Sequence, residues 1–364
     1  TNWSGSNDIQ QAGNIPFAPF ANNASFFEKY NQMMLVINGV DAQTNAHSTG
    51  VIINWSGRNS VGYPTLTAVF AAKNAPSQPL SNINFGGFGQ TGNLIRFTRL
   101  EDVETLRNLL NPKSANNGDA TYKRTEEVTI IERAQQSRLR RLLDDPTLMP
   151  RQFQNLEAYQ SAVTNKGSLS EFAAFVPPDG EILAPANVNG NTTSTLGQQV
   201  QLTAAAFYAG LASAVDLYTS GYDTHTNHDQ NHEPLFSHLN ESIDLLWTLA
   251  EQKGFADRMT VVIASDFGRT PWYNADNGKD HWAIGSVIVM EKNAGWTNRV
   301  VGETDALQNA YKLKPDTLVT DDSDGITILP KHVHKALRSH LGLANTSVDA
   351  DFKFGGAEDF SFFS

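Results

Sequence analysis

Short apolar runs separated by polar, glycine-containing loops organise the first hundred residues of the chain. Residues 33–38 form such a run and end at Gly39, which is typical of a strand buried on both faces of a parallel sheet. Two further strands are predicted at 83–85 and 93–97. The pattern favours an α/β protein with its sheet in the interior.

The second half of the chain shows a clearer order of helix, strand and polar loop. Apolar positions recur at helical spacing in 196–211 and 235–252, and strands are predicted at 214–218, 259–264 and 284–290. Ligands bind at the carboxyl ends of the strands in open parallel sheets. We therefore expect the polar loops beside these strands to face one cleft.

We expect a single domain over residues 1–364, built on a mostly parallel central sheet with helices on both faces. Residues 122–143 carry opposite charges at helical spacing and predict a solvated helix. The region of about 122–189 is interpreted as a mainly helical insertion. A last helix is predicted to begin at Pro330 and to end before Gly342.

Composition and charge narrow the class of protein. The 364 residues are 40% hydrophobic and carry a formal net charge of −11, which disfavours nucleic acid and anionic lipid surfaces as partners. No run approaches the roughly 18 consecutive apolar residues of a transmembrane helix. Cysteine is absent, so thiolate ligands and a cysteine nucleophile are excluded, while the cellular compartment stays open.

The densest group of potential metal ligands lies at 221–232, where three histidines and two aspartates occur within twelve residues. Imidazole and carboxylate groups are ligands that zinc and similar divalent ions prefer. Two more polar loops, 265–268 and 277–281, flank predicted strands. The candidate metal ligands are Asp223, His225, His228, Asp266, Asp280 and His281. The histidines of the following helix, His232 and His238, are interpreted as surface residues.

Three motifs carry a resemblance to a known family. The chain reads GYDTH at 221–225, SDFGRT at 265–270 and GKDH at 278–281. In this order they resemble the family called domain of unknown function 1501, a branch of the alkaline phosphatase and sulfatase superfamily. The resemblance is strongest over residues 196–343 and looser in the first half.

The resemblance implies an alkaline phosphatase-like fold and a metal-dependent hydrolase of phosphate or sulfate esters. The metal would be a divalent ion, zinc first, with manganese or calcium as alternatives, and the substrate a small anionic ester. By position the nucleophile would be Ser48 or Thr49, unless these residues only form a turn or cap. Arg269 would either bind the anionic substrate or form a structural ion pair.

Two departures from the superfamily pattern weaken the expectation of a second metal. Phe267 stands where phosphatases carry a second-site histidine, and no early strand with an aspartate is evident before Met33. A binding or structural protein that retains the fold without catalysis is therefore the alternative, and an enzyme with one metal and a different reaction is a third. The resemblance also implies a periplasmic or extracytoplasmic location. The oligomeric state stays open.

Overall fold

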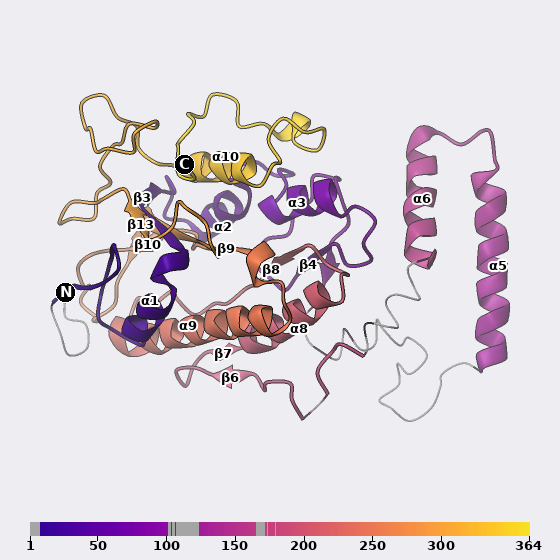
Figure 1. Cartoon of the computed structure of the whole chain (residues 1–364), viewed down its shortest axis with the longest axis horizontal. Helices are drawn as coiled ribbons and strands as arrows, with labels where there is room; N and C mark the ends of the chain where they lie inside the picture. The colour runs from indigo at the N-terminus through magenta and orange to yellow at the C-terminus, as the bar shows by residue number, and fades with distance from the viewer. Residues whose placement is uncertain are drawn as a thin grey trace.

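The computed structural model describes residues 8–100, 103, 106, 124–164, 172, 174–178 and 180–364. Two small sheets lie in the middle of the main body, between a layer containing α2, α3 and α10 and a layer containing α1, α8 and α9 (Figure 1). The helices of these layers are α1 (Asn23–Tyr30), α2 (His47–Ser56), α3 (Leu66–Asn74), α8 (Leu196–Tyr208), α9 (His228–Gln252) and α10 (Pro330–His340).

The larger sheet is mixed rather than mostly parallel. Its order is β13 (Arg299–Val301), β3 (Met34–Asp41), β12 (Ile284–Glu291) and β9 (Thr260–Ile263). Strand β13 is parallel to β3, whereas β12 is antiparallel to both β3 and β9. The expectation of a mostly parallel central sheet is therefore wrong for this sheet.

The connection between β9 and β12 explains the reversal. It contains the hairpin of β10 (Gly268–Arg269) and β11 (His281–Trp282), and no crossover helix. A parallel neighbour requires a long crossover, whereas a hairpin-like connection brings the chain back antiparallel. The predicted strands themselves are confirmed at β3, β9 and β12.

The smaller sheet is parallel throughout, with the order β5 (Thr98–Arg99), β4 (Asn82–Asn84) and β8 (Ala214–Asp216). The strands predicted near 83–85 and 214–218 are confirmed, with bounds that differ by one or two residues. The strand predicted at 93–97 is wrong, because Asn93 has a φ of +61° and lies in a turn that precedes β5.

Helix α9 is longer than its apolar pattern predicts. It begins at His228 and continues across Pro234, although a proline inside a helix removes one backbone hydrogen bond. Its buried face, which includes Ile243, Trp247 and Ala250, packs with Val200 of α8 into one apolar core. The second half of α9 is thus packed into the core of the protein.

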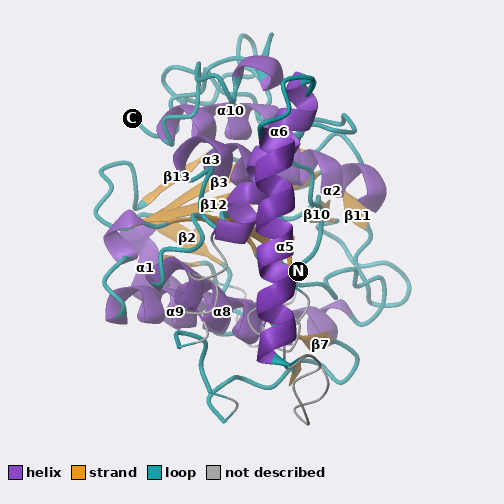
Figure 2. Cartoon of the chain, turned by 90° about the vertical axis from the view of Figure 1, so that its right-hand side faces the viewer, coloured by secondary structure: helices purple, strands orange, loops and turns teal. Residues whose placement is uncertain are grey.

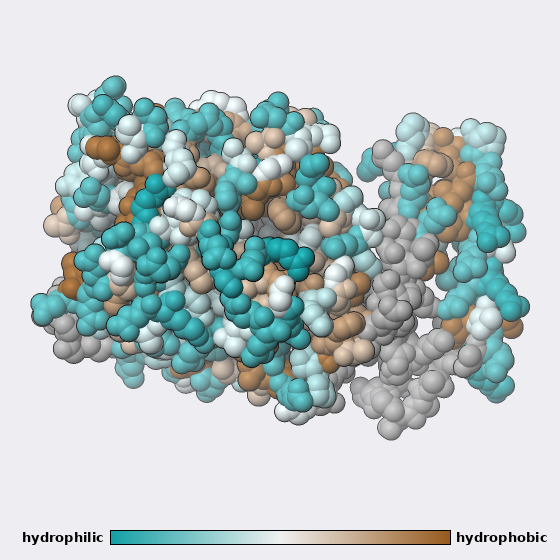
Figure 3. All heavy atoms as spheres, viewed as in Figure 1, coloured by the Kyte–Doolittle hydropathy of each residue, from teal (hydrophilic) through white to brown (hydrophobic). Residues whose placement is uncertain are grey.

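The predicted helical insertion contains an antiparallel pair of helices, α5 (Thr125–Leu143) and α6 (Pro150–Thr164). This hairpin stands beside the main body (Figures 1 and 2). Its outer surface is largely hydrophilic, with apolar side chains between the helices (Figure 3).

Among the described residues, no helix combines the length and apolar character needed to cross a membrane. The remaining elements are β1 (Gln10–Ala12), β2 (Ile15–Phe17), β6 (Ala186–Asn187), β7 (Thr193–Ser194) and the short 3-10 helices Asn31–Met33, Ala256–Arg258 and Ala350–Phe352.

Candidate metal centre

Helix α2 brings His47 to the loop that follows β9. His47 is the first residue of α2, and Gly50 one turn later lies against that loop, because a Cβ there would be only 2.9 Å from the carbonyl oxygen of Asp266. This close approach places His47 Nδ1 2.5 Å from Asp266 Oδ2. The absence of a side chain at Gly50 therefore positions the histidine.

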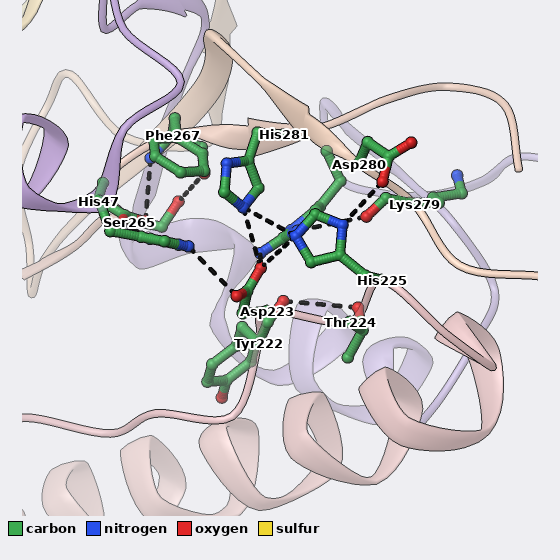
Figure 4. Close-up of polar contacts among 12 residues, drawn as sticks. His47, Tyr222, Asp223, Thr224, His225, Ser265, Phe267, Lys279, Asp280 and His281 are labelled. Atoms are coloured by element: carbon green, nitrogen blue, oxygen red, sulfur yellow. Dashed lines mark hydrogen bonds and ion pairs between the residues drawn. The ribbon is translucent and has the colours of Figure 1, made fainter. Parts of the chain in front are cut away.

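The loop after β8 meets the β10–β11 hairpin. The backbone N–H of Lys279 donates to the Thr224 carbonyl at 3.1 Å. A Cβ on Gly278 would lie 1.8 Å from the carbonyl oxygen of His225, so only glycine fits between the two segments. This contact places Asp223 and His225 beside His281 of β11 (Figure 4).

Four side chains form what we call the His/Asp cluster: His47, Asp223, His225 and His281. Asp223 Oδ1 lies 3.0 Å from Nε2 of His225 and 3.0 Å from Nε2 of His281, and these two nitrogens are 3.0 Å apart. His47 Nε2 lies 3.4 Å from the other carboxylate oxygen, Oδ2. One ligand atom each from His47, Asp223 and His281 can be chosen so that all lie within 4.8 Å of one another, a grouping that can hold a metal ion.

Outer partners determine which nitrogen of each ring faces the cluster. His281 Nδ1 lies 2.7 Å from the carbonyl oxygen of Asn45, which can only accept, so in the neutral ring Nδ1 carries the hydrogen and Nε2 an unshared pair. His225 Nδ1 faces Asp280 Oδ1 at 2.7 Å, and His47 Nδ1 faces Asp266. Carboxylate and carbonyl partners of this kind orient metal-binding histidines.

This arrangement is electrostatically incomplete without a cation or an added proton. In neutral rings, two unshared pairs on His225 and His281 face each other and a carboxylate oxygen. Among the described residues, the buried Nε2 of His47 has no hydrogen-bond partner. Imidazole nitrogens and one carboxylate form a donor set that suits zinc and related divalent ions.

Arg269 forms the ion pair that the sequence left open. Its Nη2 donates to Asp223 Oδ1 at 2.6 Å, its Nη1 donates to the carbonyl of Lys279 at 3.2 Å, and its side chain is 13% exposed. Burial favours the neutral acid, but the hydrogen bond from Arg269 and its positive charge outweigh it and hold the pKa of Asp223 well below its usual range. Asp223 is therefore ionised and available as a ligand.

The other predicted ligands lie around the cluster rather than at its centre. Asp266 and Asp280 contact the outer nitrogens of His47 and His225. His228 is the first residue of α9, and its Nδ1 lies 2.6 Å from the hydroxyl of Thr224. Asp266 and Asp280 thus contact histidines of the cluster, whereas His228 contacts the residue between Asp223 and His225.

The predicted nucleophiles and the missed histidine are neighbours. Ser48 is exposed and Thr49 half-buried in the first turn of α2, and in the described part of the chain neither hydroxyl is hydrogen-bonded to the cluster. His47, directly before them, was not predicted as a ligand. The signal was its position after the loop that follows β3, at the sheet edge where the other ligands were expected.

Phe267 covers the cluster on one side. It is 6% exposed, and its ring centroid lies 4.7 Å from that of His47 and 4.6 Å from that of His281. The side chain at the position where the resemblance led us to expect a histidine thus packs on two rings of the cluster.

Comparison with known proteins agrees with the resemblance seen in the motifs. No curated protein matches the chain. The profile of a family described as protein of unknown function, DUF1501, matches residues 15–324, a span that contains the whole His/Asp cluster and all three motifs. Because the match covers well over half of the sequence, the chain belongs to the DUF1501 family.

Proposed function

We propose that this protein is a metal-dependent hydrolase of phosphate or sulfate esters with one divalent ion, zinc first, in the His/Asp cluster. The observation that carries the proposal is the convergence of imidazole nitrogens on Asp223, with the outer nitrogens held by Asp266, Asp280 and the Asn45 carbonyl. Hydrogen bonds that orient histidines in this way are characteristic of metal sites.

The residues around the cluster suit an anionic ester. A bound divalent ion would supply Lewis acidity and a more acidic bound water. Helix α2 has Ala46 as its N-cap, and the N–H of Thr49 already donates to the Ala46 carbonyl at 3.0 Å. Among the described residues, the N–H groups of His47 and Ser48 have no such partner and could face an anion beside His47. Arg269 adds a fixed positive charge, and the 50% exposure of the Asp223 side chain leaves the cluster open to solvent.

Ser48 and Thr49 remain our proposed nucleophiles, because both lie in that first turn of α2 beside His47. A hydroxyl at a helix N-terminus is favoured as its alkoxide by the helix dipole. Hydrolysis of aryl phosphate and aryl sulfate by Ser48→Ala and Thr49→Ala variants would assign the role. Loss of turnover in only one variant identifies that residue as the nucleophile. Full turnover in both variants excludes both hydroxyls as the nucleophile.

Metal content tests the proposal directly. We expect wild-type protein purified without chelator to hold close to one equivalent of divalent metal by plasma mass spectrometry, and His47→Ala, Asp223→Ala and His281→Ala to hold almost none. His340→Ala is a matched control. His340 also pairs with a carboxylate, since its Nε2 lies 2.9 Å from Glu291 Oε2, but it lies outside the cluster. Wild-type protein that takes up no metal after soaking with zinc, manganese or calcium contradicts the proposal.

A binding protein without catalysis is the second candidate, and the Arg269–Asp223 ion pair favours it. The guanidinium already neutralises the carboxylate and so substitutes for part of a metal's charge. Under this alternative, Arg269→Gln destabilises the loops and no metal is found. Under the hydrolase proposal, the same variant retains its metal and loses affinity for the anionic ester.

A further inference from the structure

Thr224 lies between Asp223 and His225 in sequence, but its side chain projects from the opposite side of the loop that carries all three residues. Asp223 and His225 are directed toward His281, whereas the Thr224 side chain points away from it (Figure 4). Alternation of this kind is expected in an extended segment. Thr224 is only 5% exposed, so its hydroxyl is enclosed by the protein.

Two histidines of α9 hold that hydroxyl. Thr224 Oγ1 lies 2.6 Å from Nδ1 of His228 and 3.1 Å from Nδ1 of His232, which are one helical turn apart. The same hydroxyl lies 3.5 Å from the carbonyl oxygen of Tyr222. Because a hydroxyl can both donate and accept, each ring contact forms with the tautomer that complements it.

Burial keeps both rings neutral. It lowers the pKa of His228 to about 4 and that of His232 to about 3, and nearby positive charges act in the same direction. The rings lie 4.4 Å apart, and His232 stacks on Phe236 at 4.9 Å. Both imidazoles are therefore fixed to the helix surface.

The same region of α9 holds the neighbouring backbone. The Tyr222 hydroxyl donates to the carbonyl of Leu235 at 3.0 Å, and the N–H of His228 donates to the carbonyl of Asn277 at 2.8 Å. The second bond reaches the loop that carries Asp280 and His281. The start of α9 thus contacts both loops that supply the His/Asp cluster.

We infer that His228, His232 and Thr224 form a positioning clamp, in which two imidazoles on α9 hold one hydroxyl and thereby set Asp223 and His225 in their ligand positions. The clamp rests on the proposed metal site and extends it, since none of its three side chains belongs to the His/Asp cluster. Its role is to restrict the motion of an extended loop by attaching the loop to a helix that is packed in the core.

Zinc affinity of the full chain tests the clamp. We expect Thr224→Val, which keeps the shape and removes the hydroxyl, to weaken zinc binding about 10-fold or more in a chelator competition. Thr224→Ser restores the hydroxyl and binds as wild type. Ser194→Ala is the matched control, because it removes another hydroxyl–imidazole contact to α9, the 3.0 Å contact between Ser194 Oγ and His238 Nε2.

Two outcomes overturn the clamp: unchanged zinc affinity in Thr224→Val, or equal weakening in Ser194→Ala. If the wild type binds no zinc, the proposed function fails, and the imidazole ¹H–¹⁵N spectrum of metal-free protein then decides the clamp. We expect His225 to be protonated at Nδ1 in the wild type and to exchange between tautomers in Thr224→Val. Identical His225 signals in both proteins overturn the inference independently of metal.

Discussion

At the scale of single residues, the arrangement of the His/Asp cluster depends on side chains that contact its members from outside. Asp280 was predicted as a ligand, yet its Oδ1 accepts from His225 Nδ1 and also from the side-chain amide of Asn274 at 3.1 Å. A carboxylate in this position makes the imidazole a stronger ligand and fixes its tautomer. The motif residue therefore supports the cluster without entering it.

Asp280→Asn tests that role. The amide keeps the shape of the carboxylate but loses its charge, so we expect zinc affinity to fall about 10- to 100-fold. Asp276→Asn changes an exposed carboxylate in the same loop and should leave affinity unchanged. Titration against a chelator measures both variants, and an equal effect of the two would show that loop charge alone is responsible.

Asp216 at the end of β8 is a buried acid outside the cluster. It is 2% exposed, Asn84 donates to its Oδ2 at 3.2 Å, and within the described part of the chain its Oδ1 has no hydrogen-bond partner. Burial raises its pKa to about 7, although hydrogen bonds from Thr67 and Asn84 oppose the shift. The folded protein therefore binds this proton more tightly than the unfolded chain does.

Because its pKa is raised in the folded state, Asp216 stabilises the protein less as pH rises. The stabilisation by Asp216 is complete below its unfolded pKa and is lost as pH rises from about 4 through about 7, a change of roughly 4 kcal/mol at most. We expect Asp216→Asn to gain stability relative to wild type at pH 8 and little at pH 4. Urea unfolding at both pH values measures this, and a pH-independent difference contradicts it.

At the scale of elements, α10 holds α2, the helix that carries His47. His334 of α10 is 7% exposed, and its Nε2 donates to the carbonyl of Asn54 at 2.8 Å. Burial lowers the pKa of His334 to about 4. Protonation of this ring therefore opposes the packing of the two helices.

Acid should consequently loosen this contact. The stabilisation by neutral His334 is complete above its unfolded pKa of 6.5 and is lost as pH falls through about 4, by roughly 3 kcal/mol. We expect His334→Gln to lose less stability than wild type between pH 7 and pH 4.5 in thermal unfolding. The Asp216 contribution changes in the opposite direction, so the difference between variant and wild type is the informative quantity, and parallel curves would reject the assignment.

At the scale of the whole molecule, the α5–α6 hairpin stands beside the body that contains the cluster (Figures 1 and 2). Leu139 is buried, but Ile130 is 66% and Met149 62% exposed. A two-helix hairpin of this kind contributes little to a core formed by other elements. The α5–α6 hairpin and the His/Asp cluster are therefore structurally separate.

Replacement of residues 124–164 by a flexible linker tests this separation. We expect the main unfolding transition and the zinc affinity to stay as in the full chain, because the cluster is supplied by α2, by the loop after β8 and by β11. Differential scanning calorimetry and chelator competition measure the two properties. A large drop in either would show that the hairpin supports the body.

The sequence predicted the elements better than it predicted their arrangement. Helices α8, α9 and α10 and strands β3, β9 and β12 follow from local periodicity, because burial of one face imposes that period. The antiparallel entry of β12 does not, since a strand's direction depends on the connection that leads to it. Motif spacing identified Asp223, His225 and His281, but it did not identify His47.

Some properties of this protein are determined by its sequence alone: its acidic charge, its lack of thiol chemistry, its α/β elements and the loops that carry Asp and His. These depend on residue type and on neighbours along the chain. Tertiary structure alone decided which of those polar residues meet. His47 and His281 are distant in sequence, and whether an aspartate lies at the cluster or behind a histidine depends on approaches of a few ångströms, such as those at Gly50 and Gly278. Such distances arise from packing between elements, which no local pattern encodes.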